Sequence, residues 1–260
     1  MTKKQSDAWS ISYVTTLLSN WSFSVHRVPP AESEKRADLL ASVENERYII
    51  EIKTRDNPED IKDLIAAANQ EGTAHIGRQV NYRNKYSRLL RDASMQLANT
   101  SSYQGDFRIA WFILPESDWE YQSDVLSKTT FGLRTVRIHD GDVEDPWRRC
   151  YYYDPGEFYR QRDVDAVVVS IPTGVRLLLN NFSPRADSLR GSSLFSRFSE
   201  EDAAEDPVAL ERQGRAYVIT DDIDRDGGGS HKYLLKKYGM LTTPLIEHRF
   251  DGWGSINLNE

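Results

Sequence analysis

The chain has 260 residues, of which 39% are hydrophobic and 28% charged, so it is long enough to bury the core of one large domain or two smaller ones. The net charge of −7 argues against nonspecific nucleic-acid binding over the whole surface, although it permits a local basic groove. A single cysteine, Cys150, excludes a disulfide framework and C-x-x-C metal or redox sites. With no long apolar run and no signal peptide, we expect a cytoplasmic protein with no membrane contact.

Hydrophobic spacing in the first half of the sequence predicts a mixture of helices and strands. Apolar residues at helical spacing predict a helix over 7–21, whereas FRIAWFIL (107–114) is short, apolar and typical of a buried strand. The expected elements in chain order are helix 7–21, strand 22–28, hairpin strands 37–43 and 48–54, helix 58–68, helix 76–99 and strand 107–114. This order predicts an α/β (α+β) fold in which helices flank a mixed sheet.

The second half predicts further strands but a less regular order. The expected elements are a helix at 118–129, a strand at 135–140, two strands about the Pro-Thr-Gly turn within 164–182, a strand at 215–220 and a basic helix at 230–239. The Ser-rich stretch 183–206 predicts a loop or a mobile lid. We therefore expect a core domain at 1–115 and a C-terminal extension at 116–260, which either completes the core sheet or forms a second subdomain.

Charged residues cluster on the expected hairpin. Residues two apart on a strand share a face, so Glu51 and Lys53 point the same way. With Asn45-Glu46 as the turn, Glu44 faces Arg47, Leu40 faces Glu51 and Asp38 faces Lys53, which brings Asp38 to the same face. A slip of one residue would send Asp38 to the other side of the sheet.

Two acids and an amine on one face predict a metal-dependent hydrolytic site. Asp38 and Glu51 as close neighbours repel one another, and a divalent cation removes that conflict. Hard oxygen ligands suit Mg²⁺, which binds one or two carboxylates and keeps several waters. Lys53 beside the metal is able to hold a water molecule and to offset negative charge on a phosphate.

Asp38 followed by Glu51-Ile52-Lys53 at the end of the next strand resembles the Asp…(Asp/Glu)-x-Lys signature of the PD-(D/E)xK nuclease superfamily. This superfamily includes restriction endonucleases and archaeal-type Holliday junction resolvases, and its core order is similar to the one expected over 7–114. The resemblance implies a restriction-endonuclease-like fold, a magnesium ion (replaceable by Mn²⁺) on Asp38, Glu51 and the Ile52 carbonyl, and a Lys53 that assists the attacking water. It further implies a catalytic Gln96 on the following helix.

The sequence departs from the family pattern in two places. Position 37 is Ala where the signature has Pro, and residues 8–21 contain no acid to complete the metal site from the first helix, since Asp7 lies too early. The resemblance covers less than half of the chain. It implies a magnesium-dependent DNA endonuclease acting in microbial defence or DNA processing, with a catalytically inactive binding module of the same fold as the alternative.

A basic stretch between the expected sheet elements predicts nucleic-acid contacts. RQVNYRNKYSRLLR (78–91) interleaves cations with tyrosines that are able to stack on bases. The candidate DNA-binding residues are Arg78, Tyr82, Arg83, Lys85 and Arg88, and an exposed helix face without ligand is the alternative. Because the chain is acidic overall, we expect a second copy, as a homodimer, or a protein partner to supply part of the DNA grip. A calcium-responsive loop at 221–229 is a third possibility, although Tyr233 stands where an EF-hand requires Glu.

Overall fold

The structure is a computed structural model of the whole chain. The residues that it describes are 3–29, 34–55, 61–63, 66–67, 73–100, 106–114, 116–140, 143–144, 146–225, 228–239, 245–248 and 251–257. Of the helices in these ranges, none combines the length and the apolar character needed to cross a membrane.

The chain divides into two compact units that are each discontinuous in sequence. Unit 1 comprises Met1–Arg55, Lys85–Leu114 and Gln161–Asp206, and unit 2 comprises Asp56–Asn84, Pro115–Arg160 and Pro207–Glu260. Both units draw on residues from either side of position 115, so neither coincides with the segments 1–115 and 116–260.

Unit 1 contains a mixed seven-stranded sheet, which confirms the expected α/β class. In spatial order its strands are β1 (Ser24–Arg27), β2 (Leu39–Val43), β3 (Glu46–Thr54), β5 (Phe107–Ile113), β9 (Ala166–Ile171), β10 (Gly174–Leu179) and β11 (Ala204–Glu205). The central strands β3, β5 and β9 are parallel, whereas β1–β2, β2–β3 and β9–β10 are antiparallel pairs. Residues from the expected C-terminal extension therefore complete the sheet of the core.

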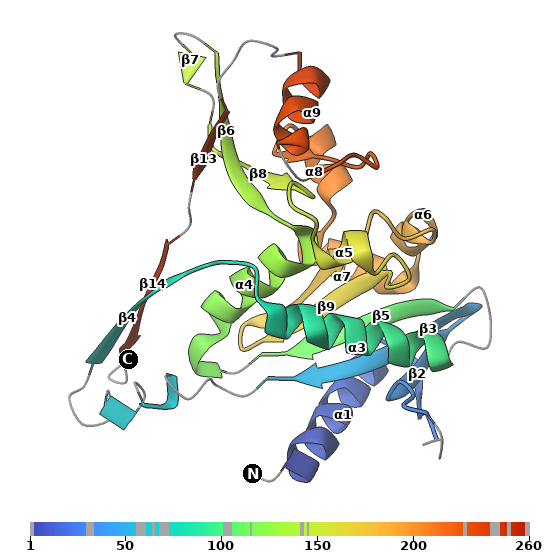
Figure 1. Ribbon diagram of the computed structural model, residues 1–260. Coiled ribbons are helices and arrows are strands. Elements are labelled where there is room, and N and C mark those ends of the chain that lie inside the picture. The colour runs from blue at the N-terminus through green and yellow to red at the C-terminus, as the bar shows by residue number, and fades with distance from the viewer. Residues whose placement is uncertain are drawn as a thin grey trace. The chain divides into compact units, whose positions relative to one another are not determined.

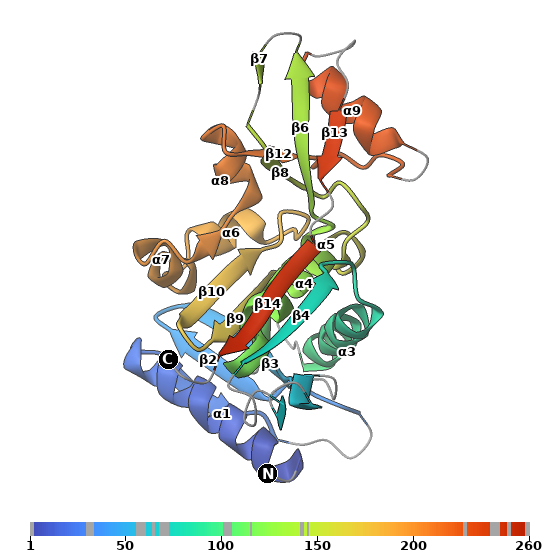
Figure 2. The same ribbon diagram turned by 90° about the vertical axis from the view of Figure 1, so that its left-hand side faces the viewer.

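Helices cover both faces of this sheet, with α1 (Lys3–Asn20) on one side and α3 (Asn84–Thr100) on the other (Figures 1 and 2). The α1 side is a continuous apolar core that includes Leu18, Ile50, Trp111 and Phe198. Two short helices, α6 (Ala186–Arg190) and α7 (Ser193–Glu200), add to this side. Alternation along β3 turns Tyr48, Ile50 and Ile52 toward this core, so Ile49, Glu51 and Lys53 face α3.

Unit 2 is built from small sheets and short helices. Its elements are β4 (Thr73–Gln79), η1 (Glu116–Asp118), α4 (Trp119–Phe131), β6 (Arg134–Asp140), β7 (Val143–Glu144), β8 (Arg148–Tyr151), α5 (Glu157–Arg160), α8 (Pro207–Arg212), β12 (Ala216–Val218), α9 (Gly229–Lys237), β13 (Leu245–His248) and β14 (Asp251–Asn257). The main sheet has the order β12-β8-β6-β13, and β4 pairs with β14. Phe131 at the end of α4 packs edge-on against Tyr151, Tyr152 and Phe158, which form an aromatic core.

Two expectations about secondary structure are wrong. The stretch 76–99 is not one helix, because its first residues belong to β4 and the helix begins at Asn84. The partner of β4 is β14, at the far end of the sequence, and local periodicity carries no signal of such a pairing. Gly77 in this stretch is also a poor helix former.

The stretch 183–206 is not a loop or lid, because it forms α6, α7 and β11. Its serines are structural: the Ser192 hydroxyl accepts a hydrogen bond from the Phe195 N–H and caps α7. Leu189, Leu194 and Phe198 are buried against the sheet. The helix expected at 58–68 is present at 61–63 and 66–67, and its other residues lie outside the described ranges.

Candidate functional site

The β2–β3 hairpin has a different register from the expected one. Leu40 lies opposite Ile49 and Val43 opposite Glu46, so the turn is Glu44-Asn45 and Glu44 adopts a positive φ of 50°. The expected pairs of Leu40 with Glu51, Asp38 with Lys53 and Glu44 with Arg47 are therefore wrong, each by two residues. Because a shift of two residues conserves the faces of a strand, Asp38 still lies on the side of Glu51 and Lys53.

Asp38 is fixed immediately before β2 by three hydrogen bonds. Its N–H donates to the Ile50 carbonyl at 3.1 Å, and its carbonyl accepts from the Val28 N–H at 3.0 Å. Its side-chain Oδ2 accepts from the Ile52 N–H at 2.8 Å. The carboxylate is thus held against the backbone of β3 beside Glu51, which is the convergence on which the predicted site depends.

Glu51 carries the unusual chemistry of the site. It lies in the middle of β3 with 3% of its surface exposed, and its Oε1 accepts from the Lys53 Nζ at 2.6 Å. The second oxygen, Oε2, is buried and accepts no hydrogen bond from a described residue. Burial raises the pKa of Glu51 to about 8; Lys53 opposes this rise and Asp38 adds to it. Burial also raises the pKa of Asp38, although the Ile52 N–H, Glu51 and Lys53 partly offset the effect.

Gln96 connects α3 to the charged strand. Its Oε1 accepts from the Lys53 Nζ at 2.7 Å, and its Nε2 donates to the Arg36 carbonyl at 3.2 Å. Lys53 thereby uses two of its three N–H donors and retains a third for a ligand. The structure brings together Asp38, Glu51, Lys53 and Gln96, all four of the candidate catalytic residues.

The last turn of α3 also holds the segment that leads into Asp38. Thr100 Oγ1 accepts from the Ala37 N–H at 2.7 Å, and Asn99 Nδ2 donates to the Lys35 carbonyl at 3.3 Å. Sequence reasoning missed Thr100 and Asn99 because both act on backbone atoms, which leave no residue pattern in the sequence. Ala37, which stands where the family signature has Pro, is buried and uses its N–H in this contact.

Lys53 and Gln96 line a solvent-accessible pocket of about 260 Å³. Its other lining residues are Lys35, Asp92, Met95 and Asn99. Met95 is unusually exposed for an apolar side chain, at 54%. The pocket gives a ligand from solvent a route to the Lys53 amine.

The residues present fit a magnesium ion that keeps several waters. The buried Glu51 Oε2 lacks a partner, and it belongs to a pair of carboxylates whose pKa values burial raises, so a cation would relieve both penalties. Within the described residues, no group of three or more His, Cys, Asp or Glu side chains is placed to hold a metal. Asp7 is exposed on α1 and is not a third acid at this site. Two carboxylates and water match the usual ligand set of Mg²⁺.

The candidate DNA-binding residues lie on different elements and belong to both units. Arg78 lies in β4, where its side chain is outside the described part, and Tyr82 and Arg83 belong to unit 2. Lys85 and Arg88 are exposed on α3 in unit 1. The five residues therefore do not share one helix, because Arg78 lies in a strand and Tyr82 and Arg83 precede α3.

The tyrosines of this stretch are engaged within the protein. The Tyr82 hydroxyl donates to Glu157 Oε1 and accepts from Arg160 Nη1, both at 2.6 Å, and the Arg160 guanidinium lies over the Tyr82 ring. Tyr86 is fully buried and packs against Phe112, so it is not available to stack on a base. Arg83 donates from Nη2 to the Tyr121 hydroxyl at 2.8 Å.

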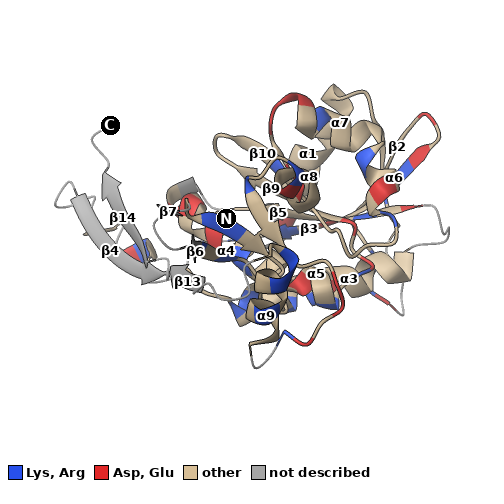
Figure 3. Ribbon diagram, turned by 90° about the horizontal axis from the view of Figure 1, so that it is seen from above, with Lys and Arg blue, Asp and Glu red and all other residues tan. Residues whose placement is uncertain are grey.

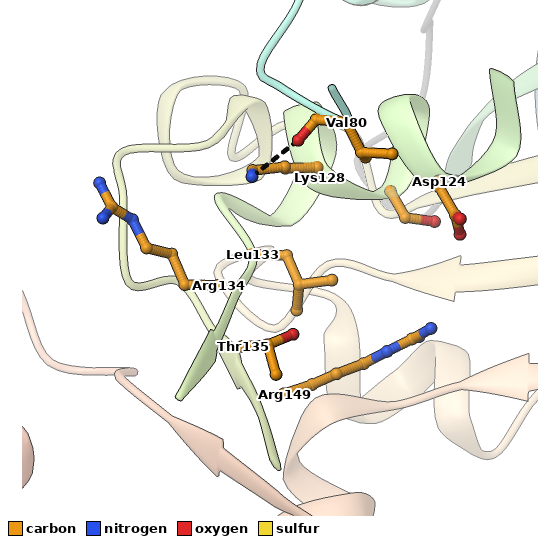
Figure 4. Close-up of a pocket in the computed structure, with 8 residues that line it drawn as sticks. Val80, Asp124, Lys128, Leu133, Arg134, Thr135 and Arg149 are labelled. Carbon is orange, nitrogen blue, oxygen red and sulfur yellow. Dashed lines mark hydrogen bonds between the residues drawn. The ribbon is translucent and has the colours of Figure 1, made fainter. Parts of the chain in front are cut away.

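A second, smaller hollow of about 50 Å³ lies in unit 2 (Figure 4). Of the three cations that line it, Lys128 donates to the Val80 carbonyl at 2.8 Å, and Arg134 points away from Leu133 and Thr135 and pairs with Asp154. In the acidic 221–229 loop, Asp222 accepts from the Tyr159 hydroxyl, whereas Asp226 and Gly227 lie outside the described residues. The pocket beside Lys53 is therefore the stronger candidate for chemistry.

Comparison of the chain with protein-family models, with curated proteins and with solved structures found no match.

Proposed function

We propose that the chain is a magnesium-dependent nuclease that hydrolyses phosphodiester bonds in DNA. The observation that carries the proposal is the buried, unpartnered Glu51 Oε2 beside Asp38, on the same face as an amine that retains a donor. Two acids, one amine and a pocket open to solvent are the groups that this reaction needs.

Each residue has a separate role in the proposal. Asp38 and Glu51, with the Ile52 carbonyl, would hold the magnesium ion, and Mn²⁺ would substitute for it. The bound ion would supply Lewis-acid stabilisation of negative charge on the phosphate. Lys53 would orient the attacking water with its remaining N–H, and Gln96 would fix the direction of the Lys53 side chain.

The surface charge supports a role for a partner in DNA binding. The net charge is −7, and acidic and basic segments are interspersed on elements such as α3, α6 and α7 (Figure 3). We propose that a second copy or a partner protein contributes part of the DNA contact, and that the protein acts in the cytoplasm in microbial defence or DNA processing.

Cleavage assays test the proposal directly. Supercoiled plasmid, linear duplex and single-stranded oligonucleotides are incubated with the protein in Mg²⁺, in Mn²⁺ and in EDTA. Loss of one charge-stabilising group at a reaction centre typically slows catalysis by about 100- to 1,000-fold, so Asp38→Asn, Glu51→Gln and Lys53→Met should each have at least this effect. Glu200→Gln, a change of an exposed acid on α7, is the matched control and should cut like the wild type.

Two results would overturn the proposal. One is equal cutting by the wild type and the three site variants, which would identify a contaminating nuclease. The other is no cutting of any substrate under any condition, alone or with candidate partners. DNA binding without cleavage would instead support the inactive module, which the lack of a third acid among the described residues at the site favours.

A further inference from the structure

Arg55 continues the line of charged residues on the α3 side of β3. It follows Glu51 and Lys53 at the same spacing, and both Lys53 and Arg55 contact α3, through Gln96 and Tyr86 respectively. The Arg55 N–H donates to the Ile113 carbonyl at 2.9 Å, so the backbone at this position is tied to β5. The Arg55 side chain therefore starts from a fixed point in the sheet.

The Arg55 guanidinium is held in place, and no described acid neutralises its charge. Its Cζ lies 5.2 Å from the centre of the buried Tyr86 ring, an arrangement in which the ring face attracts the cation. Its Nε is buried and makes no hydrogen bond to a described residue, and Arg55 forms no ion pair with any described acid. Other half-buried arginines of unit 1 are paired: Arg185 with Asp165 and Arg190 with Asp206. A guanidinium that has no counter-ion among the described residues is able to pair with an anion, so a ligand that supplies negatively charged oxygen atoms would be favoured at Arg55.

The position of Arg55 indicates which phosphate it would meet. Tyr86 and Gln96 are ten residues apart on α3, or about 15 Å along the helix axis. The Arg55 guanidinium over Tyr86 therefore lies at a distance from the Lys53–Gln96 contact, where the scissile phosphate would lie. Arg88 is exposed on the same helix, between these two points, and forms no ion pair with a described residue.

We propose that Arg55, oriented by the Tyr86 ring, binds a backbone phosphate that flanks the scissile one, with Arg88 contacting the same strand. This inference rests on the proposed function, because it takes a DNA strand as the ligand. Arg55 is a substrate-binding residue in this scheme and takes no part in bond cleavage. The α3 side of β3 then holds a DNA strand at two separated points.

The test measures DNA binding in a background that does not cut. Full-length Glu51→Gln protein in EDTA is titrated onto short fluorescent DNA oligonucleotides, single-stranded and duplex, over about 50 to 200 mM salt. Each lost phosphate contact lowers the slope of log K against log salt by about 0.9 for duplex DNA, which is about 8-fold in affinity near 100 mM. Arg55→Gln and Arg88→Gln should each show this loss, whereas Arg55→Lys should retain the slope.

Two controls separate binding from folding. Arg197→Gln changes an exposed arginine on α7, on the other face of the sheet, and should leave both slope and affinity unchanged. Melting curves are the second control, because they identify any variant that has lost its fold. An Arg55→Gln protein that is folded and has the parent's slope and affinity would overturn the inference, as would a parent that binds no DNA.

Cleavage by the otherwise native protein distinguishes this inference from the proposed function. In an active enzyme, Arg55→Gln should raise KM about 8-fold with kcat nearly unchanged, since the contact is made equally before and during the reaction. DNA binding that depends on Arg55, together with no cleavage, would support the inference about Arg55 and contradict the proposed nuclease activity. DNA cleavage at an unchanged KM and kcat in Arg55→Gln would retain the proposed nuclease and remove the inference about Arg55.

Discussion

Two of the buried carboxylates of unit 1, Asp165 and Glu51, have opposite environments. Asp165, directly before β9, is fully buried, and both of its oxygens accept from Arg185 Nε, with Ser183 and the Arg108 N–H as further donors. Glu51, on β3, shares one oxygen with Lys53, leaves the other without a partner, and lies beside a second acid. The Asp165 arrangement pairs the buried charge within the protein. The Glu51 arrangement leaves a carboxylate oxygen without a described partner, and a metal ion or a substrate could pair with it.

The largest expected difference concerns stability. Asp165→Asn should lower the free energy of unfolding by about 3 to 5 kcal/mol, because it leaves the half-buried Arg185 without its counter-ion. Urea denaturation measures the change. Asp163→Asn is the matched control, since Asp163 is 66% exposed in its pair with Arg108 and its loss should cost less than about 1 kcal/mol. Equal effects of the two changes would show that Asp165 is not the structural carboxylate described here.

Unlike Asp165→Asn, Glu51→Gln should mainly change how the free energy of unfolding depends on pH. The pKa of Glu51 is raised to about 8 in the folded protein, so below that pH the folded state keeps a proton that the unfolded chain releases above about 4.5. Stability from this group is therefore present at low pH and is lost as the pH rises toward 8, by at most about 1.4 kcal/mol per pH unit. Denaturation in EDTA at several pH values should show this slope reduced in Glu51→Gln; an unchanged slope would contradict the raised pKa.

Divalent metal should stabilise the wild type through the Glu51 site alone. At a concentration ten times the dissociation constant, Mg²⁺ or Mn²⁺ should add about 1.4 kcal/mol, or about 3 to 6 °C in melting temperature. The gain should grow with pH, because metal ligands must lose their protons. It should vanish in Glu51→Gln and persist in Asp163→Asn. A gain that survives Glu51→Gln would place the metal elsewhere.

The most indirect expected effect concerns the support of Asp38 by α3. Thr100→Val keeps the shape of the side chain but removes the acceptor for the Ala37 N–H, at a cost of about 1 to 3 kcal/mol if that donor stays buried and less if water reaches it. We expect a modest loss of stability and a several-fold loss of metal affinity, measured by the metal-dependent shift in melting temperature. Thr16→Val, at an exposed position on α1, is the control and should change neither quantity.

Local patterns in the sequence were enough to predict the strands of the site and the faces of its residues. Asp38, Glu51 and Lys53 converge because alternation along a strand survives an error of two residues in the register. The error itself arose because Glu44, which has no special preference for positive φ, takes the turn position that favours Gly or Asn. Gln96 was predictable as a polar residue on the helix that follows.

Other features depend on pairings between distant residues and have no local signal. The β4 strand exists through pairing with β14, and the helices within 183–206 are ordered by burial of Leu189, Leu194 and Phe198. Arg55 was overlooked because its environment is set by Tyr86 on α3, thirty-one residues later. The sequence alone also gave no reason to separate Tyr82 and Arg83 from Lys85 and Arg88.

The insertion of β9 beside β5 has a consequence for synthesis of the protein. Ile109–Ile113 pair with Ala166–Ser170, so β5 leaves the ribosome more than fifty residues before the strand that covers its open edge. At ordinary translation speed this interval is roughly 3 to 10 s, during which an apolar edge strand is open to pairing with other nascent chains. A chaperone or fast translation through this interval would protect the β5 edge, and a recombinant fragment that stops at Leu114 would expose it permanently.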